Sequence, residues 1–156
     1  MGHQFTRQDI ADIEAEIERR KLEERPRLIE DVKEARSHGD LSENFEYYAA
    51  KREKNRNESR IRYLDRLVRT AEIIEDASAE DEVGIGDEVT VLFEEDGFED
   101  TYILLTTLGA DSLNNKISIE SPIGRAVKGR KIGDKCTVTV SKDNHFSIII
   151  KDIKKH

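Results

Sequence analysis

Two long, charged stretches with regularly spaced apolar residues lie on either side of Gly39, and they constrain this chain more than any other feature. Within each stretch the apolar residues recur at intervals of three and four, which is the spacing of one helical face. They are Ile10, Ile13, Ile17, Leu28, Ile29, Val32 and Ala35 before Gly39, and Ile61, Leu64, Leu67, Val68, Ala71 and Ile74 after it. Because glycine interrupts helices and permits turns, we expect two helices joined by a turn.

The two stretches match each other when the chain is folded back at residues 40–41. Facing residues then have numbers that add to about 81, which pairs Ile10 with Ala71 and Ile17 with Leu64. This agreement favours an antiparallel hairpin within one chain over a coiled coil between chains, so we expect a monomer. Each arm of about 30 residues would extend about 45 Å.

Two interruptions are expected along this hairpin. Pro26 removes one backbone hydrogen bond from the first arm, and the apolar spacing continues beyond it, so we expect a kink there. The folding rule places Asn57 opposite Glu24. It places Arg56 opposite Arg25, where a packed coil would have apolar residues. We therefore predict a polar, hydrated middle between two better-packed ends.

The sequence changes character after the hairpin. Apolar alternation predicts strands at Glu88–Phe93, Thr101–Leu105, Lys116–Ile119, Cys136–Val140 and Phe146–Lys151. Ser121 as a cap, Pro122 at the first helical position and Gly129 at the end predict one short helix between the third and fourth strands. The expected fold is α+β with two domains. These are a helical hairpin over residues 1–76, a small acidic linker over residues 77–84, and an antiparallel β domain with one helix over residues 85–156.

Charge and composition exclude several classes of function. The 156 residues carry a formal net charge of −8 and neither half is basic, so binding to duplex DNA is not expected. No apolar run approaches the ~18 residues of a membrane span. The first residues lack the apolar segment of a signal peptide, so we expect a cytoplasmic protein without membrane contact. A lone Cys136 excludes an internal disulfide, and its alternation with neighbouring valines predicts a buried strand residue.

Asp40 and Glu43 follow the predicted turn and are candidates for metal binding. Two carboxylates three residues apart can share a divalent cation, and Mg²⁺ with retained waters is the best match. The alternative is helix capping, because acidic residues at an N-terminus interact favourably with the helix dipole, and composition alone favours it. Since Mg²⁺ takes about six ligands, a metal site here needs further ligands from a partner.

A basic stripe and several aromatic residues lie close to this turn. Residues 51–69 hold eight basic and three acidic side chains, so they are candidates for contact with a polyanion as well as for pairing within the helix. Tyr47, Tyr48 and Phe45 are expected to brace the turn, with stacking on single-stranded nucleic acid as the alternative. His38, in an exposed turn, is not expected to be a base or a ligand. The sequence has no Gly-rich phosphate loop, zinc motif or nucleophile triad.

Two motifs carry a resemblance to a known family. The first comprises Arg25-Pro26, Glu34–Asn44, Glu46-Tyr47 and Ala49–Lys51, and the second comprises Ser121–Ala126, Gly129 and Gly133-Asp134. In both motifs the chain resembles the bacterial Gre transcript cleavage factors, closest to the GreA type. The resemblance covers nearly the whole chain, and the acidic motif is highly specific.

The resemblance implies an accessory factor of RNA polymerase that is not an enzyme alone. Its hairpin, with an acidic tip at residues 37–45, would enter the secondary channel of the polymerase while an FKBP-like C-terminal domain docks at the channel entrance. Asp40 and Glu43 would be the catalytic pair, holding Mg²⁺ jointly with polymerase aspartates and orienting the attacking water. The polymerase's own two-metal centre would cut the backtracked RNA and rescue the arrested complex. The docking residues would be Ser121, Pro122, Ile123, Gly124 and Arg125.

The same matching implies contacts to the nascent RNA. Arg36 and Lys51 fall at basic family positions near the RNA 3′ segment, Arg52 adds to them, and Arg56 extends the stripe. Two rival functions keep the same fold or part of it. One is a channel-binding inhibitor that does not promote cleavage, and the other is a coiled-coil adaptor whose tip acids only cap the helix.

The resemblance also implies how the tip is supported and where this chain departs from the family. Tyr47 matches a family tip aromatic, and with Phe45 and Asn44 it forms the expected tip support. Phe45 replaces a small residue. Arg20, Arg56 and Asn57 replace apolar residues, which places these departures in the predicted polar middle.

Overall fold

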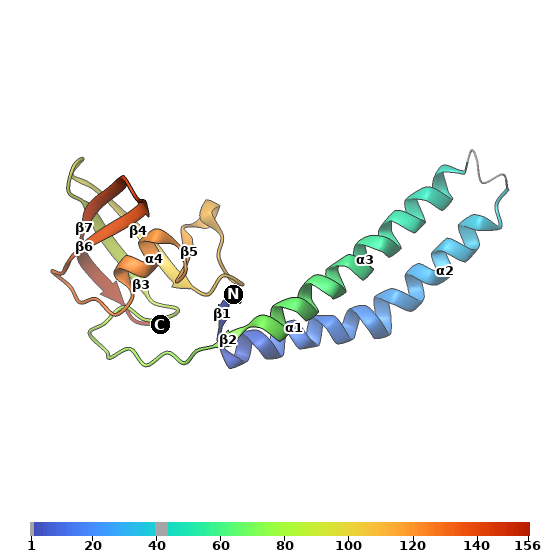
Figure 1. The fold of residues 1–156 in the computed structure, drawn as a ribbon, viewed down its shortest axis with the longest axis horizontal. Helices are drawn as coiled ribbons and strands as arrows, with labels where there is room; N and C mark the ends of the chain where they lie inside the picture. The colour runs from blue at the N-terminus through green and yellow to red at the C-terminus, as the bar shows by residue number, and fades with distance from the viewer. Residues whose placement is uncertain (1, 40–43) are drawn as a thin grey trace. The chain divides into compact units, whose positions relative to one another are not determined.

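The computed structural model describes residues 2–39 and 44–156 (Figure 1). It divides into two compact units, of which the first contains Gln8–Ala71 and the second contains His3–Arg7 together with Glu72–His156. The first unit is a helical hairpin, and the second is a β domain with one α-helix. The predicted α+β class with two domains is therefore confirmed.

The first arm of the hairpin changes its hydrogen-bonding pattern midway. Helix α1 (Arg7–Arg19) leads into a π-helical turn, η1 (Arg20–Glu24), and helix α2 (Arg25–Arg36) follows directly. Pro26 stands at the start of α2, where it has no N–H to donate and its ring crowds the carbonyl four residues earlier. The amide of Arg25 donates to the carbonyl of Arg20, five residues back. We expected a kink at Pro26, and the structure has a wider, π-helical turn just before this residue.

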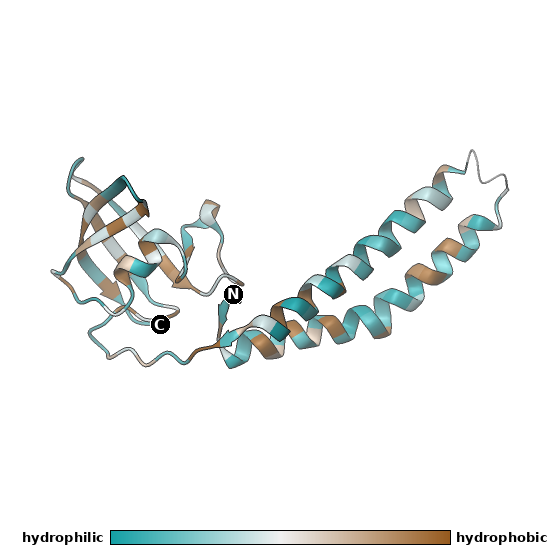
Figure 2. Cartoon of the chain, viewed as in Figure 1, coloured by the Kyte–Doolittle hydropathy of each residue, from teal (hydrophilic) through white to brown (hydrophobic). Residues whose placement is uncertain are grey.

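The second arm is one continuous helix, α3 (Phe45–Thr70). Its buried residues are Tyr47, Asn57, Ile61, Leu64 and Leu67, and those of the first arm are Ile13, Leu28 and Ala35. The predicted heptad holds at Ile61 and Leu64, but Ala71 lies past the helix end and Ile74 packs on the core of the second unit. Figure 2 shows hydrophilic residues along most of both arms, and no helix within the described ranges is long and apolar enough to cross a membrane.

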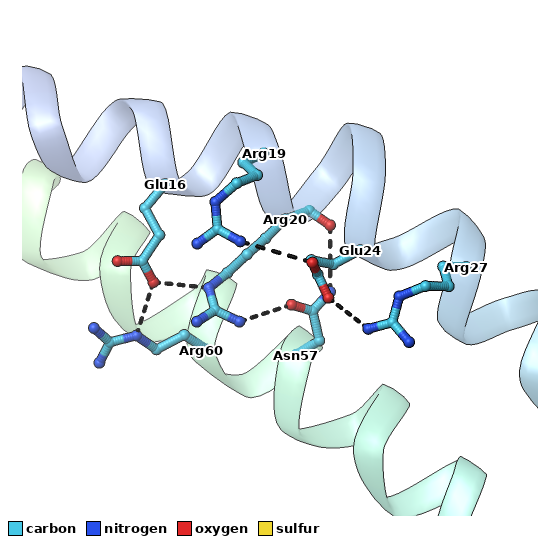
Figure 3. A network of polar contacts seen from close by, with 7 residues as sticks. All are labelled: Glu16, Arg19, Arg20, Glu24, Arg27, Asn57 and Arg60. Atoms are coloured by element: carbon cyan, nitrogen blue, oxygen red, sulfur yellow. Dashed lines mark hydrogen bonds and ion pairs between the residues drawn. The ribbon is translucent and has the colours of Figure 1, made fainter.

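A polar layer, formed by Glu16, Arg20, Asn57 and Arg60, crosses the middle of the hairpin (Figure 3). Asn57 is 4% exposed; its side-chain oxygen accepts a hydrogen bond from Arg20 Nη1 at 3.0 Å, and its nitrogen donates to the Arg20 carbonyl at 3.3 Å. Asn57 thus bonds Arg20 and not its expected neighbour, Glu24. Glu16 accepts hydrogen bonds from Arg20 Nε at 2.7 Å and from Arg60 Nε at 3.2 Å. The polar middle is confirmed, but it is not open to water at Asn57, because that side chain is buried and bonded.

The pairing of the two arms shifts across η1. Arg25, expected opposite Arg56, makes two hydrogen bonds of 2.9 Å with Glu58, and the numbers of this pair add to 83. The pairs of the polar layer, at and before the start of η1, have numbers that add to 76 or 77. A π-helical turn inserts one extra residue into one arm, which raises this sum by one, and the rest of the difference reflects how far the long arginine and glutamate side chains reach along the arms.

The second unit is built on a five-stranded sheet with the order β5-β4-β3-β7-β6. The strands are β3 (Glu88–Phe93), β4 (Phe98–Leu105), β5 (Lys116–Ser118), β6 (Lys135–Ser141) and β7 (Asn144–Lys154). Each overlaps a predicted strand, and β3 has the predicted bounds. Neighbours pair antiparallel except β4 and β5, which run parallel, so the sheet differs from the expected one at this edge. The chain returns to the same end through a segment that includes the short 3₁₀ helix η2 (Ser112–Asn114).

One short helix, α4 (Pro122–Val127), closes the core of this unit. Ser121 caps it as predicted, with the hydroxyl oxygen accepting a hydrogen bond from the Gly124 amide at 3.1 Å. Gly124 approaches the backbone so closely that a Cβ atom there would overlap the carbonyl oxygen of Ser118. Cys136 is buried in the core, as predicted, and this burial raises the pKa of its thiol.

A two-stranded parallel sheet belongs to the second unit and moves the predicted domain boundaries. Strand β1 (Gln4–Phe5) pairs with β2 (Glu72–Ile73), and the sequence does not predict either, because two residues are too few to show alternation. His3 Nδ1 lies 3.2 Å from a carboxylate oxygen of Glu120, which adds a side-chain contact to this attachment. The second unit therefore includes residues expected in the hairpin domain. It also includes Val83, expected in the linker, which is fully buried.

A buried carboxylate lies at the end of the same unit. Asp87 is 2% exposed and accepts hydrogen bonds from Lys155 Nζ at 2.6 Å, the Gly84 amide at 2.7 Å and the His156 amide at 2.9 Å. Burial alone would raise the pKa of the Asp87 carboxyl, but these hydrogen bonds hold its pKa below the usual range. The C-terminal residues are thus bonded to the start of β3.

Candidate functional site

Asn44 closes the end of the hairpin, because its side chain is bonded to both helices. Its amide nitrogen donates to the carbonyl of Ala35 near the end of α2 at 2.5 Å, and its oxygen accepts from the amide of Tyr47 in α3 at 3.0 Å. Gly39 has a φ of +133°, a conformation that favours glycine and ends the helical path of α2. The two helix ends are therefore fixed to each other on either side of residues 40–43.

Asp40 and Glu43, the predicted catalytic and metal-binding pair, lie outside the described residues. Asn44 occupies the N-cap position of α3, and its side chain makes the cap hydrogen bond, so the role of the two acids stays a prediction. Their carboxylates are hard oxygen donors of the type that Mg²⁺ takes. Within residues 2–39 and 44–156, no three His, Cys, Asp or Glu side chains are close enough together to hold a metal ion.

Tyr47 brings two of the predicted RNA-contacting residues together. It is 8% exposed, and its hydroxyl oxygen accepts a hydrogen bond from Arg36 Nη2 at 3.3 Å. The Arg36 guanidinium and the Lys51 ammonium lie 5.4 Å and 5.9 Å from the ring centre, within cation–π range. The hydrogen bond from Arg36 lowers the pKa of the Tyr47 phenol. The Tyr47 ring thus contacts one cation from each arm, Arg36 of α2 and Lys51 of α3.

The other side chains near this end do not form a packed support. Phe45 is 84% exposed, so its ring does not brace the described part of the tip as expected. The reason is geometric. Side chains two positions apart in an α-helix point to roughly opposite sides, and the side chain of Tyr47 faces α2. Tyr48 is half exposed and lies edge-on to Tyr47 at 5.3 Å between ring centres. His38 Nδ1 lies 3.1 Å from a carboxylate oxygen of Glu46.

Internal ion pairs neutralise part of the basic stripe on α3. The pairs are Arg56 with Glu53 at 2.9 Å, Arg60 with Glu16 at 3.2 Å and Arg69 with Asp65 at 3.0 Å. Arg52 and Arg66 are exposed and have no ion pair within the part of the chain that the structure describes. Of the predicted RNA-contacting residues on this helix, Arg52 is thus more available to a polyanion than Arg56.

Tyr63 extends this stripe, and the sequence reasoning missed it. Its ring is 40% exposed, with the guanidinium groups of Arg60 and Arg66 at 5.3 Å and 5.8 Å from the ring centre. It lines a hollow of about 490 Å³ together with Arg52, Arg56 and neighbouring polar residues. An exposed aromatic ring among arginines suits stacking against a nucleic-acid base. The signal was the spacing, since Tyr63 lies three residues from each of its two arginines.

The predicted docking segment divides into structural and exposed residues. Ser121 and Gly124 shape α4, and Ile123 packs against the core. Pro122 and Arg125 are exposed. A partner that binds this segment would therefore contact these two side chains first.

Two family models match almost the whole chain. The model described as "Transcription elongation factor, N-terminal" matches residues 3–73, and "Transcription elongation factor, GreA/GreB, C-term" matches residues 78–155. The chain belongs to the GreA/GreB family of transcription elongation factors. Members of this family are accessory factors of transcription and not enzymes themselves. The two matches meet near the boundary between the hairpin and the β domain.

Curated relatives agree with this assignment. Transcription elongation factor GreA of Streptococcus sanguinis (strain SK36) is 43% identical over 148 residues, covering 94% of this chain and 92% of the relative. Transcription elongation factor GreA of Streptococcus thermophilus (strain ATCC BAA-491 / LMD-9) is 45% identical over 144 residues, covering 92% and 89%. A solved structure of the GreA factor homolog 1 protein of Thermus thermophilus aligns over 99% of this chain and 100% of its own at 24% identity and a TM-score of 0.46.

Proposed function

We propose that this elongation factor binds RNA polymerase and stimulates the Mg²⁺-dependent cleavage of backtracked RNA by the polymerase's own active centre. The observation that carries the proposal is the closure of the hairpin by Asn44, which leaves Asp40 and Glu43 in the connection between two long helices. Membership of the GreA/GreB family over both units supports it.

The dimensions of the hairpin fit a part that reaches into a channel. Helix α3 contains 26 residues. At 1.5 Å per residue it is about 39 Å long, and two packed helices are only about 20 Å across. In the sequence, the acidic pair stands between the two arms, at the arm ends opposite to those that join the second unit. We infer that the second unit docks on the polymerase through the exposed Pro122 and Arg125.

Asp40 and Glu43 would provide two oxygen ligands for a Mg²⁺ ion, and polymerase aspartates and an RNA phosphate would provide the rest. When bound, such an ion supplies charge stabilisation at the phosphoryl group. The two carboxylates would also accept hydrogen bonds from the attacking water and orient it. Division of the ligands between two proteins explains why the chain needs the polymerase for cleavage.

The basic side chains beside the tip would hold the displaced RNA. Arg36 and Lys51, positioned by Tyr47, lie closest to the acidic pair in the chain and would contact phosphates near the RNA 3′ end. Arg52 would contact the next phosphates. Arg56 would contribute less, because Glu53 already pairs with it.

The test is a cleavage assay on a purified backtracked elongation complex with Asp40→Asn and Glu43→Gln. We expect polymerase binding to persist and stimulation of cleavage to fall by about 100-fold in each variant, as for loss of one group that stabilises a transition state. Glu30→Gln, an exposed acid on α2, is the matched control and should keep full activity.

Three results would contradict the proposal. Full activity in both tip variants would exclude the acidic pair as the catalytic element. A native protein that binds polymerase without stimulating cleavage would instead be a channel-binding inhibitor. Failure to bind polymerase at all would favour a coiled-coil adaptor.

A further inference from the structure

Two turns of the second unit enclose an aromatic hollow that the proposed function does not use. The β3–β4 turn and the β6–β7 turn come together beside the backbone hydrogen bond from the Glu94 amide to the Ser147 carbonyl. Between them is a hollow of about 350 Å³, floored by Phe93 and Phe146 and walled by polar residues of both turns, including Glu95 and Asp96. This volume is at the lower end of the range for ligand pockets, about 300–1,000 Å³.

Three phenylalanine rings form one continuous cluster at this place. The ring centre of Phe93 lies 5.7 Å from that of Phe146 and 6.1 Å from that of Phe98. Phe93 and Phe146 pack against the core on one side, so their positions are fixed, whereas Phe98 is 57% exposed. The cluster therefore joins two partly buried rings to one exposed ring.

Two carboxylates, those of Glu95 and Asp96, line the hollow beside this aromatic cluster. The segment between Phe93 and Thr101 contains the acids Glu94, Glu95, Asp96, Glu99 and Asp100 and has no basic residue. Lys135 pairs with Glu94 at 3.3 Å. Glu95, Asp96 and Glu99 are exposed and have no ion pair within the described residues. From the β6–β7 turn, Asn144 and His145 line the hollow, so apart from His145 the ionisable side chains of its lining are acidic.

We propose that this aromatic hollow binds a positively charged, arginine-bearing segment of a partner protein. A guanidinium group can stack on the phenylalanine faces while its N–H groups donate to the rim carboxylates, which uses both features of the site at once. The acidic rim would repel the phosphates of a nucleic acid and the anionic surface of a membrane. Charge complementarity therefore selects a basic polypeptide.

The test measures binding of a fluorescently labelled synthetic peptide of alternating arginine and leucine to the full-length protein. Its matched probe is a peptide with glutamate in place of each arginine. We expect saturable binding of the arginine peptide alone, and an affinity reduced about tenfold by Phe98→Ser or by Glu95→Lys. Both positions are exposed, so the fold should tolerate the changes.

Matched control variants separate this site from general attraction to an acidic protein. Leu113→Ser removes a 93% exposed apolar side chain from η2, and Glu80→Lys makes the same charge change as Glu95→Lys in another loop. Both controls should bind the arginine peptide as the native protein does. Amide and ring NMR signals should shift at Phe93 and Phe146 when the peptide is added.

Four outcomes would overturn the proposal: no saturable binding of the arginine peptide, equal losses in the controls, binding of the glutamate peptide, or binding of a labelled single-stranded RNA that Phe98→Ser abolishes. Concentration-dependent self-association that blocks the hollow would assign it to a second copy of this chain instead. Because the assay contains no polymerase, its failure would leave the cleavage proposal intact. A failed cleavage assay would likewise leave the peptide result unaffected.

Discussion

The hairpin and the β domain are stabilised by different chemistry. The β domain gathers ten buried residues, all apolar or cysteine, into one cluster. The hairpin spaces its buried residues singly along two arms and includes the polar layer around Asn57. Burial of apolar surface supplies most of the free energy of folding, so the hairpin depends more on side-chain hydrogen bonds than the β domain does. The difference indicates that length and charged surface, more than a large core, determine the hairpin sequence.

The strongest test of this contrast is to break the one buried charge of the β domain. Asp87→Ala leaves Lys155 without its ion-pair partner and two backbone amides without their acceptor. We expect the free energy of unfolding of this unit to fall by about 3 kcal/mol, measured by urea denaturation. Asp152→Ala, an exposed acid on β7, should change it by less than about 0.5 kcal/mol. A loss of equal size in both variants would contradict the role of Asp87.

The polar layer can be broken in the same way in the hairpin. Asn57→Ala removes two hydrogen bonds from a buried position, and we expect a loss of about 1–2 kcal/mol in the helical transition followed by circular dichroism. Asn55→Ala on the exposed face of α3 is the matched control. No difference between the two variants would show that the layer contributes nothing to stability.

A double substitution sharpens the comparison further. Arg20→Leu together with Asn57→Leu gives the hairpin an apolar middle like the core of the β domain. Replacing a buried polar pair by apolar residues is often neutral or stabilising, so we expect the double variant to be at least as stable as the native protein. A double variant less stable than Asn57→Ala would mean that the layer does more than satisfy its own polar groups.

Much of the fold was predictable because it follows simple periodicities. The alternation of apolar and polar residues predicted both ends of β3. Ser121 followed by Pro122 predicted the start of α4. Strands β1 and β2 are too short to show a pattern in the sequence. The parallel pairing of β5 with β4 depends on the path of the loop between them, which the local sequence does not encode. Val83 was missed because one apolar residue in an acidic stretch shows no period.

The candidate site was predictable in part, for a related reason. The predicted turn indicated the acidic pair, and the family motif indicated Arg36 and Lys51 near it, but neither gave information about which side chains touch. Helical geometry places the cations of Arg36 and Lys51 within cation–π range of the Tyr47 ring. The same geometry directs the Phe45 side chain to solvent. Arg25 and Asn57 bond partners other than those the counting rule gives, because long side chains reach along the arms and the extra residue of the π-helical turn is invisible to a counting rule.

The smallest expected effect concerns pH and the carboxylate of the polar layer. Partial burial raises the pKa of Glu16, but hydrogen bonds from Arg20 and Arg60 lower it overall. A depressed pKa in the folded state stabilises the hairpin above the unfolded pKa of about 4.3, and this contribution is lost as the pH falls through the folded value. We expect Glu16→Gln to lower stability by less than about 1 kcal/mol at pH 7 and to flatten the acid limb of the hairpin transition.

The same titration separates the two units. Asp87→Asn should flatten the acid limb of the β-domain transition and leave that of the hairpin unchanged, because the pKa of Asp87 is also held low. An identical acid limb in Glu16→Gln and in the native protein would contradict the contribution of the polar layer.

The parallel pairing of β1 with β2 has a consequence for how this architecture can be altered. The chain leaves the β domain after Arg7 and returns at Glu72, and the strands on either side of this gap are hydrogen-bonded neighbours. The hairpin is therefore an insertion whose entry and exit are held side by side, independent of the length of what lies between them. Such an insertion behaves as a cassette: whole heptads added to or removed from both arms would change its reach while the two attachment points stay the same.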